Sequence, residues 1–298
     1  MTIETLSGEL AAAVEANAAS VVRVEGRPRR ASSGVAWSAE GVIVASHHAV
    51  DAEEGVQVGL ADGRTVEAKV AGRDPGRDLV VLRVEAAGLV PPRWAEASAA
   101  RVGHLVAGLS RPGRAVRAQL GIVSAVAGPW RAPSGGRLER YLESDLALHP
   151  GFSGGLLLGA DGVALGVNTA GLLRGTSLAI PAETVRHVVA AVLARGRVRR
   201  GYLGIGTQPV ALTADLRERL GQPSALIVLS VQPDTPAAKA GLLMGDVLLR
   251  GGGEVLTHPG ALLPALDEER VGQEVAFEVL RAGRTVKVSV VVGERAGG

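Results

Sequence analysis

Short valine-rich segments, each bounded by Gly, Pro or Asp, constrain the fold of this chain more than any other feature. Examples are GVIVAS (41–46), GVQVGLADGRTVEAKVAG (55–72) and DLVVLRVE (78–85). In the second segment, Ala61, Asp62 and Gly63 separate two runs in which apolar and polar residues alternate, the pattern of a β-hairpin. Short strands separated by frequent turn residues are typical of all-β domains. The sequence therefore predicts a mainly β fold.

Four segments depart from this pattern and predict helices: residues 2–19, residues 181–196, and two in the tail of the chain, TPAAKAGL (235–242) and PGALLPALDEE (259–269). Residues 2–19 are alanine-rich with polar interruptions, and residues 181–196 carry an apolar stripe that opens with Pro and ends with Arg-Gly. A basic connector, VRRGYLGIG (198–206), follows the second helix and begins a new strand pattern. We therefore expect one domain over residues 1–197 and a second over residues 198–298.

Composition excludes several classes of function. Aromatic residues make up only 2% of the chain, and the formal net charge is +2 with no basic stripe, so we expect no nucleic-acid partner. The absence of cysteine excludes disulfides, thiolate zinc sites and a cysteine nucleophile. We expect neither a metal nor a cofactor.

The N-terminal region contains no targeting signal that the sequence reveals. No stretch approaches 18 consecutive apolar residues, and no basic region followed by an apolar core opens the chain. As written, the chain is expected to have no membrane segment and to be cytoplasmic. A location in the periplasm or cell envelope is the expectation for a processed or trimmed form.

A serine lies among glycines in HPGFSGG (149–155). A serine hydroxyl is a poor nucleophile unless a base takes its proton and hydrogen-bond donors stabilise the oxyanion that develops. The glycines allow a tight turn in which the N–H groups of Gly151 and Ser153 converge on one point. Taken alone, the motif is equally compatible with an ordinary glycine-rich turn in which Ser153 has no chemical role.

The candidates for the base are His47 and His48, which end the strand pattern GVIVAS. The other histidines lie in predicted helices and strands, or too close to Ser153 in the sequence. Adjacent residues of an extended chain face opposite sides, so at most one of the pair serves as a base. A metal site at this pair lacks a carboxylate at ligand spacing such as HExxH.

Two aspartates are candidates for the residue that orients the base. Asp74 precedes Pro75 and is explained as a turn residue. Asp78 stands at the start of the apolar strand LVVLRV, where an unpaired carboxylate is costly to bury and an imidazole N–H would relieve that cost. A solvated carboxylate at a strand start is the alternative for Asp78. The order His, Asp, Ser is one of the known orders of the catalytic triad.

From about residue 20 to residue 292, the motifs resemble the HtrA (Deg) serine proteases, which are chymotrypsin-like enzymes. The motifs that carry the resemblance are SSGVAWSAEGVIVASHHAV, GRDPGRDLVVLRV, GIVSAVAG, SDLALHPGFSGGLLL, ALGVNTA, SLAIPAETV, RGYLGIG, VQPDTPAAKAGLLMGDVLLRGGG and VGQEVAFEVLRAGRTVKVSV. The resemblance implies a chymotrypsin-like double β-barrel followed by a small α+β PDZ domain.

The resemblance also implies residue roles. His48 is implied as the base, Asp78 as the residue that orients it, and Ser153 as the nucleophile. The other implied roles are an oxyanion hole formed by backbone N–H groups of Gly151, Phe152 and Ser153, a specificity pocket at Leu148, Asn168, Thr169 and Ala170, and a loop that binds a peptide carboxylate at Tyr202, Leu203, Gly204 and Ile205. An ordinary strand start is the alternative for this last loop.

The function implied by the resemblance is ATP-independent cleavage of unfolded or damaged proteins after small aliphatic residues. The PDZ domain is implied to bind apolar peptide C-termini or to regulate activity, and the chain is implied to form a homo-oligomer, a trimer in this family. The alternative function is a proteolytically silent or weak chaperone or adaptor on the same scaffold.

The chain departs from the family pattern at several positions. Phe152 replaces the usual Asn, Leu156 the usual Pro, and His47 the usual Asn, and no aromatic residue precedes Trp37. A bulky ring at Phe152 is expected to alter substrate access or to favour an inactive loop state. The missing aromatic residues weaken the expectation of a trimer.

Overall fold

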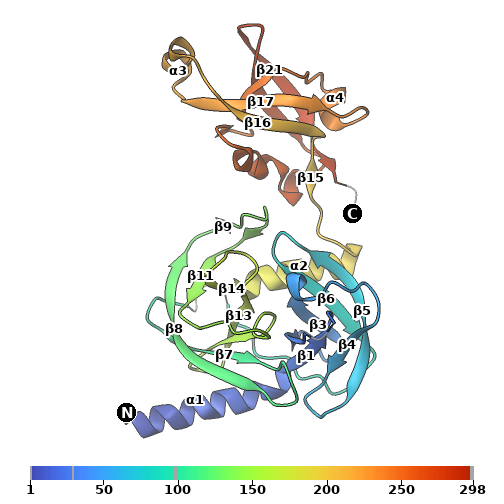
Figure 1. The fold of residues 1–298 in the computed structure, drawn as a ribbon, viewed down its shortest axis with the longest axis vertical. Helices are drawn as coiled ribbons and strands as arrows, with labels where there is room; N and C mark the ends of the chain where they lie inside the picture. The colour runs from blue at the N-terminus through green and yellow to red at the C-terminus, as the bar shows by residue number, and fades with distance from the viewer. Residues whose placement is uncertain (1, 29, 97–99, 296–298) are drawn as a thin grey trace. The chain divides into compact units, whose positions relative to one another are not determined.

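The structure is a computed structural model that describes residues 2–28, 30–96 and 100–295. It divides into two compact units, Met1–Val198 and Arg199–Gly298. The division falls beside the domain boundary expected from the sequence. Figure 1 shows two barrels in the first unit and a separate sheet in the second. Each unit is described by itself.

Six antiparallel strands close the first barrel in the order β1-β2-β3-β6-β5-β4. Their bounds are β1 Val21–Glu25, β2 Ser32–Ala36, β3 Val42–Ser46, β4 Val56–Gly59, β5 Thr65–Asp74 and β6 Leu79–Val84. The hairpin expected around Asp62 joins β4 to β5, and the Leu60 N–H donates to the Arg64 carbonyl across its turn at 2.8 Å. Alternation of Val and polar residues therefore located β4 and β5 correctly.

A second barrel of six strands has the order β11-β14-β13-β12-β7-β8. Its strands are β7 Leu105–Ser110, β8 Arg117–Ala127, β11 Tyr141–Ser144, β12 Leu156–Gly159, β13 Ala164–Thr169 and β14 Ser177–Pro181. A small two-stranded sheet of β9 Trp130–Arg131 and β10 Arg137–Leu138 extends from it. The barrels pack against each other where β1 and β2 meet β7. This contact brings the ends of strands from both barrels together.

The helices of the first unit begin and end where the sequence signals them. Helix α1 spans Ile3–Asn17 and continues as a 3₁₀ turn, η1 Ala18–Ser20. Helix α2 spans Ala182–Arg195 and ends at Gly196, whose φ of 73° is the left-handed conformation of a helix C-cap. Its buried Val and Ala side chains join the core between the barrels.

Aliphatic side chains fill the core, as the low aromatic content requires. One buried cluster spans the two barrels and α2, and a second fills the first barrel with residues such as Val22, Ile43 and Leu82. Burying aliphatic side chains of this size stabilises a fold by about 1.5–3 kcal/mol each. The barrels are therefore rigid supports for the loops at their ends.

The second unit is a sheet with the strand order β16-β17-β18-β20-β21, in which β16 is an edge strand. Its elements are β15 Gly201–Tyr202, β16 Ile205–Ala211, α3 Ala214–Leu220, β17 Ser224–Val231, α4 Pro236–Lys239, β18 Val247–Gly251, β19 Glu254–Val255, η3 Pro259–Leu266, η4 Glu268–Arg270, β20 Glu274–Arg281, β21 Arg284–Val291 and β22 Gly293–Glu294. The 3₁₀ segment η3 occupies the place where the sequence predicted a helix and packs against β16.

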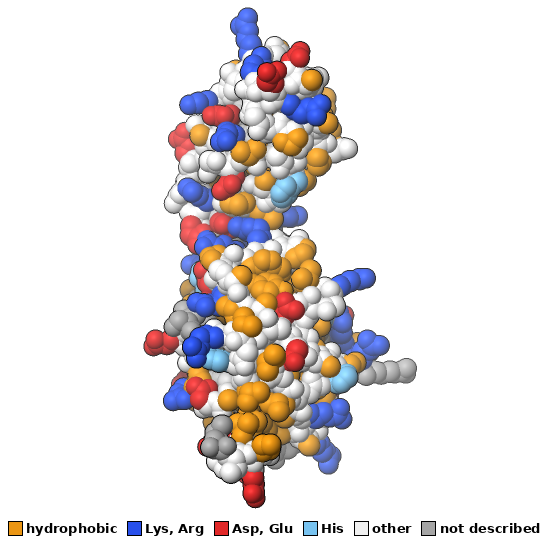
Figure 2. All heavy atoms as spheres, turned by 90° about the vertical axis from the view of Figure 1, so that its left-hand side faces the viewer, with side chains coloured by type: hydrophobic (Ala, Val, Ile, Leu, Met, Phe, Trp, Pro, Cys, Tyr) orange, Lys and Arg blue, Asp and Glu red, His pale blue; other side chains and the backbone are white. Residues whose placement is uncertain are grey.

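Apolar side chains are exposed on one face of the first unit. Figure 2 shows them gathered at the end of that unit where Figure 1 places α1 and β8. Ile3, Leu6 and Leu10 from α1, with Ala118 and Leu120 from β8, line an apolar groove of about 670 Å³ there. Among the described residues, no helix combines the length and the apolar composition that crossing a membrane requires.

Candidate active site

His48 lies in a single 3₁₀ turn, η2 His47–Ala49, which directly follows β3. The sequence-based argument treated this segment as extended, with the two imidazoles on opposite faces. The turn instead forms because the His47 N–H donates to the Asp78 carbonyl at 3.0 Å and the Val50 N–H donates to the His47 carbonyl at 3.0 Å. Strand pairing alone therefore does not orient His48.

Asp78 precedes β6, which pairs with β3, so its side chain lies beside the turn that carries His48. The carboxylate is buried, with 3% of the residue exposed. Its Oδ1 accepts the His48 backbone N–H at 2.8 Å, and its Oδ2 lies 2.8 Å from Nδ1 of His48. A carboxylate held at Nδ1 fixes the ring orientation and leaves Nε2 free to accept a proton.

The neighbouring candidates take other roles. Oδ1 of Asp74 accepts the Gly76 N–H at 3.1 Å, and its Oδ2 pairs with Arg77 at 2.9 Å, as expected for a turn residue. Nδ1 of His47 lies 3.4 Å from a guanidinium nitrogen of Arg73. Burial lowers the pKa of His47 below its ordinary value, and the charge of Arg73 lowers that pKa further. The structure therefore brings His48, and not His47, to Asp78.

The turn before Ser153 has the geometry of an oxyanion-binding loop. The Phe152 N–H donates to the His149 carbonyl at 3.0 Å, which closes a four-residue turn over Pro150 and Gly151. Gly151 has φ of 94°, and Pro followed by a residue of positive φ defines a type II turn. In this turn the Gly151 N–H belongs to the central peptide and is not used by the closing bond, so it is available to an acceptor outside the turn.

Phe152 behaves differently from the sequence-based expectation in two respects. Its N–H is engaged by the His149 carbonyl, so of the three expected oxyanion donors only the N–H groups of Gly151 and Ser153 stay candidates. Its side chain is 3% exposed and lies edge-on to the His149 ring, with ring centroids 6.5 Å apart. The ring is thus directed into the protein, and it does not crowd the space beside the nucleophile.

Three consecutive residues, the last of β13 and the two that follow it, contact all three candidate catalytic residues. The hydroxyl of Thr169 donates to Oδ2 of Asp78 at 2.5 Å, and the Ala170 N–H donates to Oγ of Ser153 at 3.2 Å. A Cβ placed on Gly171 would lie 2.4 Å from Nδ1 of His48. His48, Asp78 and Ser153 therefore meet around one short segment, although they come from different barrels.

Within the part of the chain that the structure describes, no hydrogen bond joins His48 to Ser153. The hydroxyl of Ser153 accepts the Ala170 N–H instead. Catalytic hydrogen bonds are often long in the absence of substrate and shorten in the substrate complex. The arrangement is that of a resting site.

The predicted specificity pocket is only partly supported by this geometry. Thr169 was expected in the pocket wall, but its hydroxyl is bonded to Asp78. Asn168 is 1% exposed, and its side-chain amide donates to the Leu156 carbonyl at 2.9 Å. Leu148 packs against the core of the second barrel, and Ala170 is exposed beside Ser153. A role for Leu148 and Ala170 in the pocket stays a prediction.

Sequence reasoning missed the contacts of Thr169 with Asp78 and of Gly171 with His48. The available signal was a polar residue, Thr169, ending the apolar run ALGVNT. Such a position suggests a buried hydrogen bond. The partner, however, lies on the other barrel and is distant in the sequence.

In the second unit, the segment Tyr202 to Ile205 connects β15 to the edge strand β16. The Leu203 carbonyl accepts the Ala237 N–H at 3.0 Å, and the Gly204 carbonyl accepts the Gln232 N–H at 2.8 Å. Gly204 has φ of 83°, which a residue with a side chain rarely adopts. The loop is thus held in place through its carbonyl groups. It precedes β16, whose outer edge pairs with no other strand among the described residues and could accept an added peptide strand.

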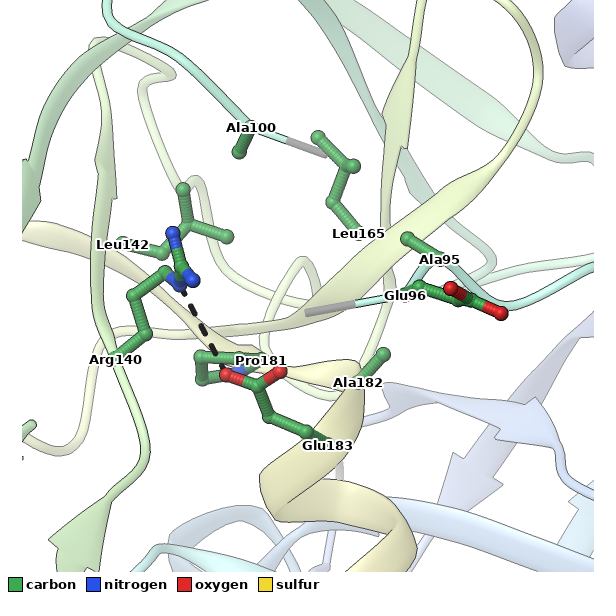
Figure 3. Close-up of a pocket in the computed structure, with 9 residues that line it drawn as sticks. All are labelled: Ala95, Glu96, Ala100, Arg140, Leu142, Leu165, Pro181, Ala182 and Glu183. Atoms are coloured by element: carbon green, nitrogen blue, oxygen red, sulfur yellow. Dashed lines mark ion pairs between the residues drawn. The ribbon is translucent and has the colours of Figure 1, made fainter. Parts of the chain in front are cut away.

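The second barrel also contains a small cavity, away from His48 and Ser153, that is too small to bind a substrate (Figure 3). Arg140 and Glu183 face it, 3.9 Å apart, and its volume is about 20 Å³. Burial raises the pKa of Glu183 above its ordinary value, although Arg140 opposes that change. A space of this size holds about one water molecule. It is not a substrate site.

Comparisons with known proteins agree with this geometry. Residues 32–167 match the trypsin-like peptidase domain family, and residues 201–292 match the PDZ domain family. The fold and the site thus define a trypsin-like serine peptidase joined to one PDZ domain. A probable periplasmic serine endoprotease, DegP-like, of Halomonas elongata is 32% identical over 274 residues, which cover 89% of this chain and 57% of that protein.

Solved structures extend the match to the whole chain. The HtrA-type protease AlgW with tripeptide is 31% identical, with a TM-score of 0.75 over 97% of this chain and 98% of that one. The serine endoprotease from Yersinia pestis is 29% identical, with a TM-score of 0.74 over 95% of this chain and 97% of that one. The chain belongs to the HtrA family of serine proteases. It spans little more than half the length of the curated relatives it matches.

These relatives correct one expectation. The sequence was interpreted as that of a cytoplasmic protein, but the relatives from Halomonas, Marinomonas and Brucella are named as periplasmic. The cytoplasmic assignment is therefore wrong. That assignment rested on finding no recognisable targeting signal in the sequence. The residues of a folded domain do not themselves indicate where the protein is located.

Proposed function

We propose that this protein is a serine endopeptidase in which His48 is the general base, Asp78 orients it and Ser153 is the nucleophile. The observation that carries the proposal is the contact of residues 169, 170 and 171 with Asp78, Ser153 and His48, respectively. One short segment thereby brings together a base, a buried carboxylate and a hydroxyl. These are the groups that acyl transfer requires.

In the proposed reaction, Nε2 of His48 takes the proton of Ser153 as Oγ attacks the carbonyl carbon of the scissile bond. The carbonyl oxygen becomes an oxyanion that accepts hydrogen bonds from the N–H groups of Gly151 and Ser153. The imidazolium then gives its proton to the leaving amine as the C–N bond breaks, and an acyl-enzyme remains. Water, deprotonated by His48, hydrolyses this ester. Asp78 stays ionised and stabilises the imidazolium.

We propose unfolded or damaged proteins as substrates, cleaved without ATP, metal or cofactor. Support comes from the named relatives, which are serine endoproteases, and from the carbonyl-held loop and free edge of β16 in the second unit. The Halomonas relative's name further supports a periplasmic location for this chain. Assembly into a homo-oligomer stays a prediction.

Cleavage of casein by the wild-type chain and by Ser153→Ala tests the catalytic proposal. We expect the variant to lose cleavage by a factor of about 10³ or more, because loss of a triad member leaves only binding and oxyanion stabilisation. Ser124→Ala, at an exposed position of β8, is the matched control and should cleave as the wild type does. Equal cleavage by wild type and Ser153→Ala would refute the proposal and favour the alternative, a non-catalytic chaperone or adaptor.

For the second unit, we propose that a peptide pairs with β16 as an added strand and that its C-terminal carboxylate binds the N–H groups of the Tyr202–Ile205 loop. The AlgW structures, solved with a tripeptide and a decapeptide, support peptide binding in this family. Affinity for an apolar peptide with a free carboxylate should exceed that for its C-terminal amide. Equal affinities would contradict carboxylate recognition.

A further inference from the structure

Ser33 is a fully buried residue of β2 that lies at the contact between the two barrels. Pairing of β2 with β3 begins only at Gly34, which pairs with Ala45. The ladder with β3 therefore leaves the polar groups of Ser33 available for other partners. Those partners belong to residues 149–155, the segment that contains Ser153 and is called here the nucleophile turn or oxyanion turn.

Ser33 contacts this turn through three of its groups. Its hydroxyl donates to the Gly151 carbonyl at 2.7 Å, and its N–H donates to the Ser153 carbonyl at 3.3 Å. Its own carbonyl oxygen lies 2.1 Å from where a Cβ on Gly154 would be, so the two backbones approach closely. One residue of the first barrel thus contacts the nucleophile turn on both sides of Ser153.

The two carbonyls that Ser33 holds flank the peptide between Phe152 and Ser153. The N–H of that peptide is one of the two proposed oxyanion donors. The preceding peptide, which joins Gly151 to Phe152, is held at both ends, because its N–H, that of Phe152, donates to the His149 carbonyl. With the peptides on either side fixed, the direction of the Ser153 N–H is fixed as well.

Arg111 determines the direction in which the Ser33 hydroxyl donates. The Arg111 N–H donates to Oγ of Ser33 at 2.8 Å, so the hydroxyl proton is left for the Gly151 carbonyl. The guanidinium is itself buried and donates to the carbonyls of Val21, Ala18 and Arg114 at 2.6, 2.7 and 2.6 Å. Arg111 is thereby fixed to the first barrel and to the N-terminal segment.

We propose that Ser33 is a positioning residue for the oxyanion turn, with Arg111 as its anchor. This inference rests on the proposed peptidase function. Ser33 touches neither substrate nor reacting atoms, and it acts by holding the carbonyls of Gly151 and Ser153. Oxyanion donors contribute most when they are held in place before the reaction begins. Loss of the Ser33 hydroxyl therefore weakens stabilisation of the transition state and leaves substrate binding unchanged.

Ser33→Ala tests the proposal by steady-state kinetics on a fluorogenic peptide. We expect kcat to fall about 10- to 100-fold with KM changed less than about twofold, since removal of a whole oxyanion donor costs about 10²–10³. Affinity for a peptide boronic acid, which forms a tetrahedral adduct at Ser153, should fall by a similar factor. Hydrogen exchange of amides in residues 149–155 should quicken.

Ser110→Ala is the matched control. Ser110 is also fully buried, and among the described residues its hydroxyl has no hydrogen-bond partner. We expect wild-type kcat, boronate affinity and hydrogen exchange for this variant. If Ser33→Ala does not fold, Ser33→Cys, which keeps a weak donor of similar shape, should show a smaller loss of kcat in the same direction.

Two failures are distinguishable. Absence of Ser153-dependent cleavage in the wild type would refute the peptidase function. Hydrogen exchange would still test the positioning role in that case, because faster exchange of residues 149–155 in Ser33→Ala than in Ser110→Ala would support it and equal exchange would overturn it. Wild-type kcat, boronate affinity and hydrogen exchange in the Ser33 variants would overturn the positioning role. A rise in KM with unchanged kcat would also overturn it, because it would indicate an effect on substrate binding.

Discussion

The two barrels hold their shares of the candidate active site by different means. The first barrel holds His48 and Asp78 through side-chain hydrogen bonds to a carboxylate that is almost fully buried. The second positions Ser153 through backbone geometry, directly after a type II turn closed between His149 and Phe152. On the first barrel, replacing a single side-chain atom should therefore lower the reaction rate most. On the second barrel, changes in the direction of peptide groups should lower it most.

The largest effect should follow from changing the carboxylate. Asp78→Asn keeps one oxygen, which the His48 backbone N–H requires, and places an NH2 group opposite Nδ1 of His48. Nδ1 then accepts a hydrogen bond, and the ring proton lies on Nε2, which can no longer act as a base. We expect kcat to fall about 10⁴-fold, the scale of this change in serine proteases generally. Initial rates on a fluorogenic peptide measure it. The control Asp62→Asn, on the exposed hairpin, should have the kcat of the wild type. A fall in kcat of less than tenfold in Asp78→Asn would contradict the role assigned to Asp78.

A change at Gly171 tests whether the segment between the barrels tolerates a side chain. In Gly171→Ala the methyl group would lie 2.4 Å from Nδ1 of His48 and 2.9 Å from Oδ2 of Asp78. Displacing this pair should lower kcat about 100-fold, because small misplacements of catalytic groups cost factors of this size. Gly128→Ala, where nothing lies within 4 Å of the added atom, is the control. Equal rates for both variants would show that His48 is not confined there.

Removal of the Thr169 hydroxyl should have a smaller effect. Thr169→Val leaves the shape and deletes one of the bonds to Asp78, while both bonds from His48 remain. A hydrogen bond to a charged group contributes about 1.5–3 kcal/mol, so kcat should fall about 10-fold with KM unchanged. Thr169→Ser should restore the rate. If it fails to do so, the methyl group and not the hydroxyl would be the element that matters.

The smallest effect concerns stability and the neighbouring imidazole. His47 has a pKa lowered by burial and by Arg73, so the unfolded chain binds this proton more readily than the folded chain. Its contribution to stability is present above pH of about 6.5 and is lost as the pH falls below that value. His47→Asn should therefore flatten the dependence of the unfolding free energy on pH below about pH 6.5. Urea unfolding at several pH values measures this, and parallel profiles for the two proteins would exclude the role of His47.

Local patterns in the sequence were sufficient for most of the fold. Alternation of apolar and polar residues located strands such as β4 and β5, and the Pro and Gly signals located α2 from Ala182 to Arg195. Helix α3, Ala214–Leu220, was missed, because a seven-residue segment whose apolar face consists of Leu216 and Leu220 is too short to show a helical period. The 3₁₀ form of η3 was also missed, since Pro264 interrupts a segment otherwise rich in helix formers.

The site was less predictable than the fold. Motif order was enough to select His48, Asp78 and Ser153, but not their supporting residues. Thr169 and Ser33 form hydrogen bonds with partners on the other barrel, and no local pattern reports a contact between residues so far apart in the sequence. The burial of Phe152 depends in the same way on which face of a turn lies against the core. These features follow from packing, which a sequence pattern does not encode.

The close approach of Gly171 to His48 also has a consequence for enzyme engineering. Residues 170–176 join β13 to β14 and pass over the catalytic pair, so they are an obvious region to randomise when a new cleavage preference is sought. Any side chain at residue 171 would enter the space of the imidazole. A library should therefore keep this glycine and vary exposed positions such as Arg174.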